Sequence, residues 1–230
     1  MSRVVDEAAR ATALLDAQDK AEQLFAAAQP LVVAGVGERE LSDRVRDLAA
    51  EMFGVRRHWH KRIVRSGPNT LHPYRKRPPD RVITDDDIVF FDFGPVFAKW
   101  EADVGRTYVL GGDPVKLRLR DDLPIVWEAG KRWFDDHPEA TGAELFAHVE
   151  QLANASGWEF GGEIAGHLVG EFPHERIKGG TEHSYIAPGN PEAMRGTDSR
   201  GRLRHWILEI HLVDRARRIG GFHEQLLTLP

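Results

Sequence analysis

The chain has 230 residues, 41% hydrophobic and 29% charged, with a formal net charge of −5, so one sizeable core in a single domain is expected. The acidic balance argues against a nucleic-acid partner, and no apolar run approaches the roughly 18 residues of a membrane span. Because cysteine is absent, disulfides, thiolate nucleophiles and thiolate ligands are excluded, and a metal site must use oxygen and imidazole donors.

Two helices are predicted in the first 54 residues. Apolar residues recur at helical spacing over 14–28, and Pro30 ends that pattern. A second apolar stripe follows at 41–53, with Gly54 where a left-handed cap would fall. The break at 36–37 separates the two helices.

The next region contains two predicted strands. A short basic run over 56–65 is interpreted as solvated surface, and an irregular Pro-rich stretch follows at 66–80. The β-branched and aromatic run at 87–94 predicts a strand, and 106–111 predicts a second one. A turn at 111–114 is the expected seam between halves of about 1–112 and 113–230.

The second half repeats this order. Helical material is expected around 125–134, with Pro124 as its start or a kink. Thr141 and Glu144 have capping-box spacing at the start of another helix, and a loop-rich region spans 157–204. The repeated order of helices followed by strands predicts an α+β fold of two similar halves. Two strands are predicted to close the chain, at 205–213 and 222–229.

Three acidic residues lie within apolar strand runs: Asp92, Glu209 and Glu224. A buried carboxylate is costly unless it is paired or bound to a metal, so these acids need either a cation or an exposed strand face. Since side chains alternate along a strand, Glu209 and Glu224 can face a common centre from neighbouring strands.

Two further residues are weak signals when taken alone. Asp103 follows Asp92 by eleven residues, and a turn at Gly94-Pro95 would bring the two carboxylates together. His167 is flanked by glycines and could complete a carboxylate-rich site, although a lone histidine is more often structural.

The order of these residues carries a more specific signal. The motifs are Asp92-Phe-Gly94, Asp103-Val-Gly-Arg-Thr107, Gly166-His167, Leu208-Glu209 and Glu224. This series resembles the ligand set of the pita-bread metallopeptidases, which include methionine aminopeptidases, proline-specific aminopeptidases and dipeptidases, and creatinase relatives. The stretches 34–38 and 64–69 resemble the proline-specific members, and the resemblance covers roughly residues 15–230.

The resemblance implies the pita-bread fold and a centre with two divalent ions, of Mn, Co, Zn or Fe. Asp92 would bind one ion and Asp103 both, His167 and Glu209 would complete the ligand set of the second ion, and Glu224 would bridge the two ions. A hydroxide bridging the ions would attack an amide-type bond, with Glu209 as the proton shuttle.

Two more histidines receive roles from the resemblance. His174, seven residues after His167, would steady the tetrahedral intermediate, and His72 would contact the substrate. The implied activity is that of an aminopeptidase or Xaa-Pro-type dipeptidase acting on a small peptide or amide. The alternatives are an enzyme for a small non-peptide C–N bond and a non-catalytic binding module.

The chain also departs from the family pattern. His211 follows Glu209 where the family usually has Glu-Pro, and it would either support that carboxylate or reshape the pocket. Phe222-His223-Glu224 replaces the usual Arg-X-Glu, and alternation predicts that His223 points away from the site. We expect the chain to lack the extra N-terminal domain of proline-specific members, and the resemblance alone implies a homodimer. The charged N-terminus lacks a signal-peptide core, which favours a cytoplasmic protein.

Overall fold

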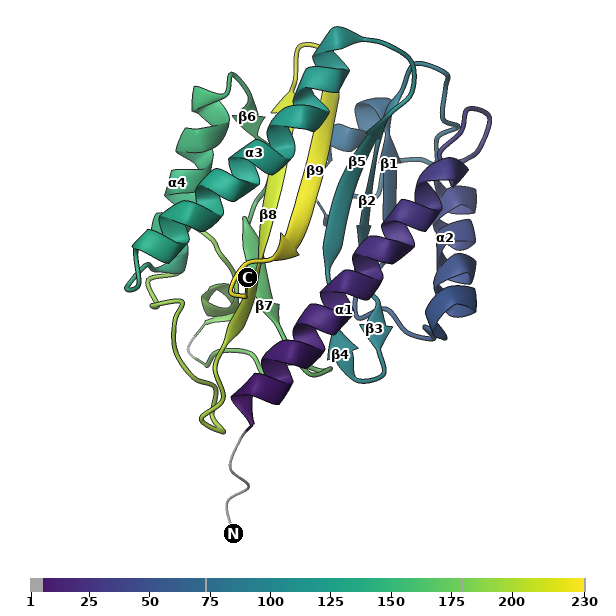
Figure 1. The fold of residues 1–230 in the computed structure, drawn as a ribbon. Coiled ribbons are helices and arrows are strands. Elements are labelled where there is room, and N and C mark those ends of the chain that lie inside the picture. The colour runs from purple at the N-terminus through teal and green to yellow at the C-terminus, as the bar shows by residue number, and fades with distance from the viewer. Residues whose placement is uncertain (1–5, 73, 179, 230) are drawn as a thin grey trace.

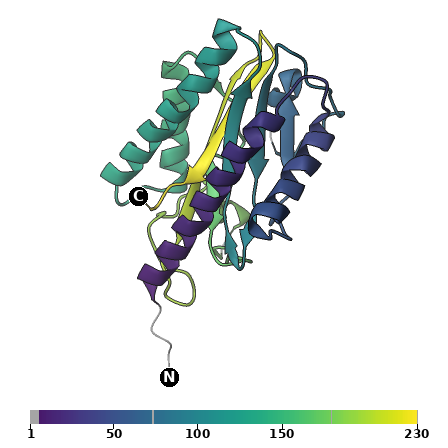
Figure 2. The ribbon, with the colours of Figure 1, turned by 45° about the vertical axis from the view of Figure 1, so that its right-hand side comes forward.

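The computed structural model describes residues 6–72, 74–178 and 180–229, which form an antiparallel sheet with helices packed on one face (Figure 1). The two early helices cover one part of the sheet, and the two later helices cover the other (Figures 1 and 2). Within these ranges, no helix combines the length and apolar character needed to cross a membrane. The α-helices are α1 (Glu7–Ala28), α2 (Glu38–Phe53), α3 (Pro114–Asp136) and α4 (Gly142–Ala155), and the 3₁₀ turns are η1 (Gln29–Leu31), η2 (Gly67–Leu71) and η3 (Thr181–Ser184).

The main sheet has the strand order β1-β2-β5-β9-β8-β6, and β7 also pairs with β8. Strands that are distant in the sequence therefore meet at its centre, where β5 of the first half pairs with β9 at the end of the chain. The main-sheet strands are β1 (Ile63–Ser66), β2 (Ile88–Phe93), β5 (Val104–Val109), β6 (Glu159–Phe160), β7 (Gly166–Val169), β8 (His205–Asp214) and β9 (Ile219–Leu226), and a separate hairpin contains β3 (Val96–Phe97) and β4 (Trp100–Glu101).

Two apolar clusters fill the space between the helices and the sheet. Under α1 and α2, the ring of Phe25 packs edge-on against Phe91 and Phe93, at centroid distances of 5.7 and 5.8 Å. Under α3 and α4, the indole of Trp127 donates to the carbonyl of Leu208 at 3.0 Å. Because alternate residues of these strands pack on the helices, the intervening residues face the opposite side of the sheet.

The structure confirms the α+β fold and most of the predicted helices. Gly54 caps α2 with a φ of +66°, a left-handed conformation that glycine adopts without steric cost. The predicted capping box between Thr141 and Glu144 is present at the start of α4.

The predicted start of the third helix is wrong. Pro124 lies inside α3, which begins ten residues earlier at Pro114. The Asp113 carboxylate accepts from the backbone N–H groups of Val115 and Lys116, at 2.8 and 3.1 Å, and proline is favoured at the first helical position. The sequence Asp113-Pro114, interpreted only as a turn, is therefore also a helix start.

The strand boundaries also need correction. β5 begins at Val104 rather than at residue 106, and β9 begins at Ile219 rather than at residue 222. Neither β1 nor β7 was predicted, and β7 lies within the stretch 157–204 that was expected to be loop. Each of these two strands has only four residues, which is too short for an alternating pattern to be recognised.

Candidate metal centre

Backbone pairing places the acidic residues in one row across the sheet face that the helices leave uncovered. Asp92 pairs with Gly105, Gly105 pairs with Glu224, and Glu224 pairs with Glu209. Directly paired residues point to the same face, so carboxylates from β2, β9 and β8 lie side by side. The structure thus brings together Glu209 and Glu224, as alternation predicted.

The row depends on a glycine at its centre. A Cβ atom on Gly105 would lie 2.4 Å from the Phe222 ring and 3.0 Å from the Cβ of Glu224. The missing side chain therefore allows β9 to approach β5 closely enough for Glu224 to reach the centre.

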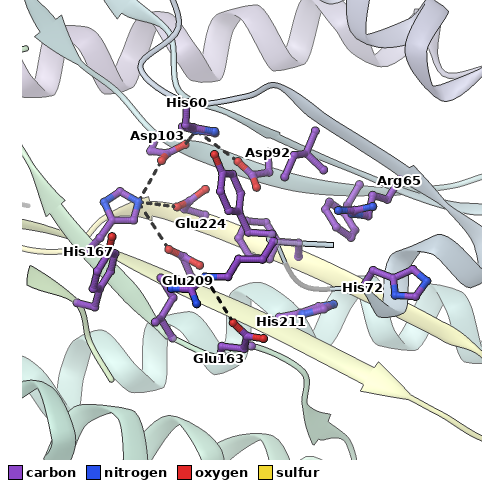
Figure 3. A pocket seen from close by; sticks show the side chains of 18 of the residues that line it. His60, Arg65, His72, Asp92, Asp103, Glu163, His167, Glu209, His211 and Glu224 are labelled. Carbon is purple, nitrogen blue, oxygen red and sulfur yellow. Dashed lines mark hydrogen bonds and ion pairs between the residues drawn. The ribbon is translucent and has the colours of Figure 1, made fainter. Parts of the chain in front are cut away.

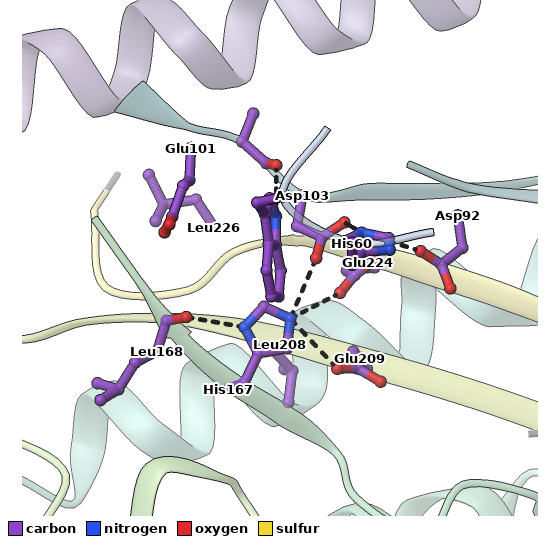
Figure 4. A network of polar contacts seen from close by, with 12 residues as sticks. His60, Asp92, Glu101, Asp103, His167, Leu168, Leu208, Glu209, Glu224 and Leu226 are labelled. Carbon is purple, nitrogen blue, oxygen red and sulfur yellow. Dashed lines mark hydrogen bonds and ion pairs between the residues drawn. The ribbon is translucent and has the colours of Figure 1, made fainter. Parts of the chain in front are cut away.

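Asp103 stands immediately before β5 and presents each oxygen to a different imidazole (Figure 4). Its Oδ2 is 3.1 Å from Nε2 of His167, and its Oδ1 is 3.0 Å from Nε2 of His60. The same His167 nitrogen lies 3.6 Å from Oε1 of Glu209 and 3.5 Å from Oε1 of Glu224. The five residues predicted as ligands therefore converge on one centre.

His60 is the residue that the sequence analysis missed. It comes from the segment between α2 and β1, and its Nε2 also lies 3.5 Å from Oδ1 of Asp92. The interpretation of 56–65 as solvated surface is wrong here, because Arg65 is 5% exposed and the His60 side chain 7% exposed. The sequence did contain a signal for this residue, because His60 lies three residues before the β-branched pair Ile63-Val64. The basic residues around it led to the interpretation as surface.

The electrostatics of this cluster call for additional positive charge. Burial raises the pKa of Asp92 to about 7 and that of Glu209 to about 8, and burial and Asp103 raise the pKa of Glu224 well above its usual range. Burial also raises the pKa of Asp103, but His60 and His167 outweigh burial and hold it below its usual range. Burial lowers the pKa of His60, but Asp103 and Asp92 reverse the effect and raise it to about 9. The four buried carboxylates repel one another at this distance, so a bound cation would stabilise their ionised forms.

The donor set fits divalent ions. Two overlapping groups of donor atoms, each within 4.8 Å, share Asp103: one adds His60 and Asp92, and the other adds His167 and Glu224. Within the described ranges, the buried Oε2 of Glu224 has no hydrogen-bond partner, which leaves a carboxylate oxygen available to an ion. Carboxylate and imidazole donors suit Mn, Co, Fe and Zn.

A cavity of about 550 Å³ opens over the row (Figure 3). Next to the carboxylates, its wall includes the rings of Phe90 and Phe222, 5.4 Å apart, with His211 6.0 Å from Phe90. Three guanidinium-bearing residues also line it: Arg65, Arg75 and Arg176. The cavity thus combines an acidic row, an aromatic wall and arginine side chains.

Two predicted catalytic histidines lie apart from the carboxylates. His174 donates from Nδ1 to Oε2 of Glu101 at 2.7 Å and is not among the residues that line the cavity. The Trp59 ring contacts both His167 and His174, at centroid distances of 4.8 and 5.7 Å. His72 lines the cavity but lies beyond Arg65, away from the acidic row (Figure 3).

The two histidines that depart from the family pattern, His211 and His223, have structural contacts. His211 faces the cavity, but its Nε2 donates to the carbonyl of Thr70 at 2.8 Å, and burial lowers its pKa to about 4. His211 was expected either to support the Glu209 carboxylate or to reshape the pocket. Its contact with Thr70 in η2 favours the second role. His223 lies on the helix side, 6.1 Å from the Trp127 ring, as alternation predicted.

The arginine-rich stretch 195–204 is attached to α3. Arg195 donates to the carbonyl of Phe134 at 2.9 Å.

Comparison with known families adds an independent finding. The model of metallopeptidase family M24 matches residues 12–196. The chain belongs to this family. The match confirms the resemblance to the metallopeptidases that the motifs carry. It ends before β8 and β9, so the placement of Glu209 and Glu224 depends on the geometry above.

Two curated relatives are archaeal Xaa-Pro dipeptidases. The one from Pyrococcus furiosus is 29% identical over 157 residues, which are 67% of this chain and 44% of the relative. The one from Pyrococcus horikoshii is 28% identical over 157 residues, again 67% of this chain and 44% of the relative. The matched region therefore spans less than half of each relative's length.

Solved structures show the same fold. A prolidase from Thermococcus sibiricus superposes with a TM-score of 0.74 at 22% identity, covering 98% of this chain and 57% of that one. A methionine aminopeptidase from Rickettsia prowazekii gives a TM-score of 0.68 at 14% identity, covering 94% of this chain and 91% of that one. The pita-bread fold predicted from the motifs is therefore confirmed.

Proposed function

We propose that the chain is a dinuclear metal-dependent hydrolase that cleaves a peptide or peptide-like amide bond. The observation that carries the proposal is Asp103, which directs one oxygen to each of two adjoining donor groups. Asp92 and Asp103 would hold one ion, and His167 and Glu209 would hold the other with Asp103. Glu224 would bridge the two, using the oxygen that has no partner among the described residues.

The ions and the protein would divide the chemistry between them. When bound, two divalent ions would polarise the scissile carbonyl and lower the pKa of an attacking water. The side chain of Glu209 is 15% exposed, compared with 2% for Glu224, so it is the carboxylate with more access to the cavity. This access suits a group that accepts a proton from water and passes it to the leaving amine.

The proposed substrate is a short peptide, most simply one with proline after the scissile bond. Support comes from the two relatives named Xaa-Pro dipeptidase and from the cavity wall. Phe90 and Phe222 offer apolar ring surfaces for a compact ring, and the arginines that line the cavity offer partners for a free carboxylate. His72, which lies beyond Arg65, would contact the substrate away from the reacting bond, and no contact with substrate is assigned to His174.

A second candidate is a small non-peptide amide. It is favoured by Phe222, which stands where the family pattern has arginine in Arg-X-Glu and which adds an aromatic surface to the wall. The identity of the metal, a cytoplasmic location and a homodimer remain predictions from the sequence.

The test combines metal content with a substrate screen. Protein purified without chelator is titrated with Mn, Co, Zn and Fe, and bound ions are counted by elemental mass spectrometry. We expect two ions per chain at saturation and hydrolysis of Xaa-Pro dipeptides that a chelator abolishes. Cleavage of non-peptide amides alone would support the second candidate, and a chain that binds no ions would refute both.

A further inference from the structure

His60 faces both carboxylates that the first half of the chain brings to the centre, although no ligand motif in the sequence includes it. We propose that His60 is a ligand of the ion on the Asp92 side, so that each of the two ions binds one imidazole. This inference rests on the proposed two-metal centre and adds a nitrogen donor to it.

The distances fit a shared ion. His60 Nε2 lies 3.0 Å from Oδ1 of Asp103 and 3.5 Å from Oδ1 of Asp92. Donors held at about 2.1 Å from one ion at tetrahedral or octahedral angles are themselves roughly 3.0–3.4 Å apart. On the opposite side, His167 Nε2 lies 3.1 Å from Oδ2 of Asp103 and 3.5 Å from Oε1 of Glu224. The two imidazoles therefore stand in matching positions around Asp103.

The orientation of the ring is fixed by its other nitrogen. Nδ1 of His60 donates to the carbonyl of Lys61 at 2.7 Å, and Nδ1 of His167 donates to the carbonyl of Leu168 at 2.8 Å. In both residues this contact directs Nε2 at the carboxylates, so that Nε2 would bind an ion once the ion displaces its proton. Metal-binding histidines in proteins are typically oriented in this way.

Packing holds the segment against the site. The backbone N–H of Trp59 donates to the carbonyl of Gly94 at 2.9 Å, immediately after β2. A Cβ on Gly94 would lie 2.3 Å from the Trp59 indole and 2.4 Å from the His60 ring, so only glycine allows this approach. His60 is therefore set in place by the fold rather than by a chance surface rotamer.

A ligand and a hydrogen-bonding partner would have different consequences. If His60 only donated to Asp103, one ion would have a nitrogen donor and the other only oxygen donors. As a ligand, His60 gives both ions mixed nitrogen and oxygen shells, which favour Co, Fe or Zn over the harder Mn on the Asp92 side.

The test compares His60→Phe with His58→Phe. His58 lies in the same segment, but its ring packs 6.0 Å from Phe93 on the helix side of the sheet. Cobalt is titrated by calorimetry, and the imidazole groups around bound cobalt are counted by X-ray absorption. We expect two ions in the wild-type protein with one imidazole per ion. In His60→Phe, the affinity for one of the two ions should fall by at least about 100-fold, a larger loss than the removal of a residue that only supports a ligand would cause. His58→Phe should bind both ions with unchanged affinity.

Either of two results would overturn the assignment while leaving the two-metal proposal intact. One is a His60→Phe protein that binds two cobalt ions with unchanged affinities. The other is a wild-type protein with two ions and only one imidazole between them, a measurement that does not depend on the folding of any variant. Failure of the wild-type protein to bind cobalt would instead refute the two-metal centre itself.

Discussion

The two halves of the sheet bring similar chemistry to the centre by different structural means. The second half uses regular strands: β7 carries His167, β8 carries Glu209 and β9 carries Glu224. The first half has only Asp92 within a strand, whereas Asp103 stands between strands and His60 in the segment before β1. Local alternation therefore suffices to orient the acids of the second half, while the first half depends on tertiary packing.

Asp103 joins the two halves, so its loss should have the largest effect. Asp103→Ala removes one oxygen from each donor group, and both ions should be lost or greatly weakened. Mutation of a residue that only supports a metal ligand already lowers metal affinity or activity by roughly 10–100-fold. Because Asp103 is itself a proposed ligand of both ions, we expect kcat/KM to fall by more than about 100-fold. Ion content and hydrolysis of a dipeptide measure this.

Asp113→Ala is the matched control, because it removes a carboxylate that caps the N-terminus of α3 and does not belong to the donor groups of the centre. It should cost about 1 kcal/mol of unfolding free energy and leave metal binding unchanged. An Asp103→Ala protein with two tightly bound ions would contradict the central position of this residue.

Substitution of Gly105 tests whether its close pairing with Glu224, which joins β5 to β9, positions the metal centre. In Gly105→Ala, the new methyl group would push Phe222 and the backbone of β9 away and displace Glu224. We expect a loss of about 1–3 kcal/mol in unfolding free energy and a decrease in metal affinity of about 10–100-fold. Gly112→Ala is the control, since its added Cβ meets no atom within 4 Å. Equal metal affinities in the two variants would show that close approach at Gly105 does not position the site.

The same contrast explains what could be predicted from the sequence. Glu209 and Glu224 lie in long strands whose alternation is visible, so their shared face could be inferred before their pairing was known. The contact between His60 and Asp103 joins residues 43 apart, and no local pattern encodes it. The resemblance implied a catalytic role for His174, which stays a prediction; the packing of Trp59 beside its ring and its hydrogen bond to Glu101 are contacts that only the folded chain shows.

His211 distinguishes a histidine that shapes the cavity from one that binds metal. His211→Ala removes the donor to Thr70 and part of the aromatic wall, so KM should rise and unfolding free energy should fall by about 1–3 kcal/mol. Metal affinity should change by less than about 10-fold, below the range for residues that support a ligand. His211→Gln, which can restore a donor to the Thr70 carbonyl, should recover part of the stability. A larger loss of metal affinity would return His211 to the role of a partner of Glu209.

His205 tests whether the loss of folding stability at low pH arises partly from a buried histidine outside the acidic row. It begins β8 and is 4% exposed, and burial together with Arg10 lowers its pKa from 6.5 to about 4. Because the folded-state pKa is the lower one, its contribution to stability is complete above pH 6.5 and is lost as pH falls toward 4.

The expected loss between pH 7 and pH 5 is about 2 kcal/mol, at 1.36 kcal/mol per pKa unit. Urea unfolding of chelator-treated wild-type and His205→Phe proteins at both pH values measures the difference between their pH dependences. Chelation removes the competition between protons and metal ions at the carboxylates, so a difference of this size would belong to β8 itself. Identical pH dependences would show that His205 does not contribute and would direct attention to the other buried histidines.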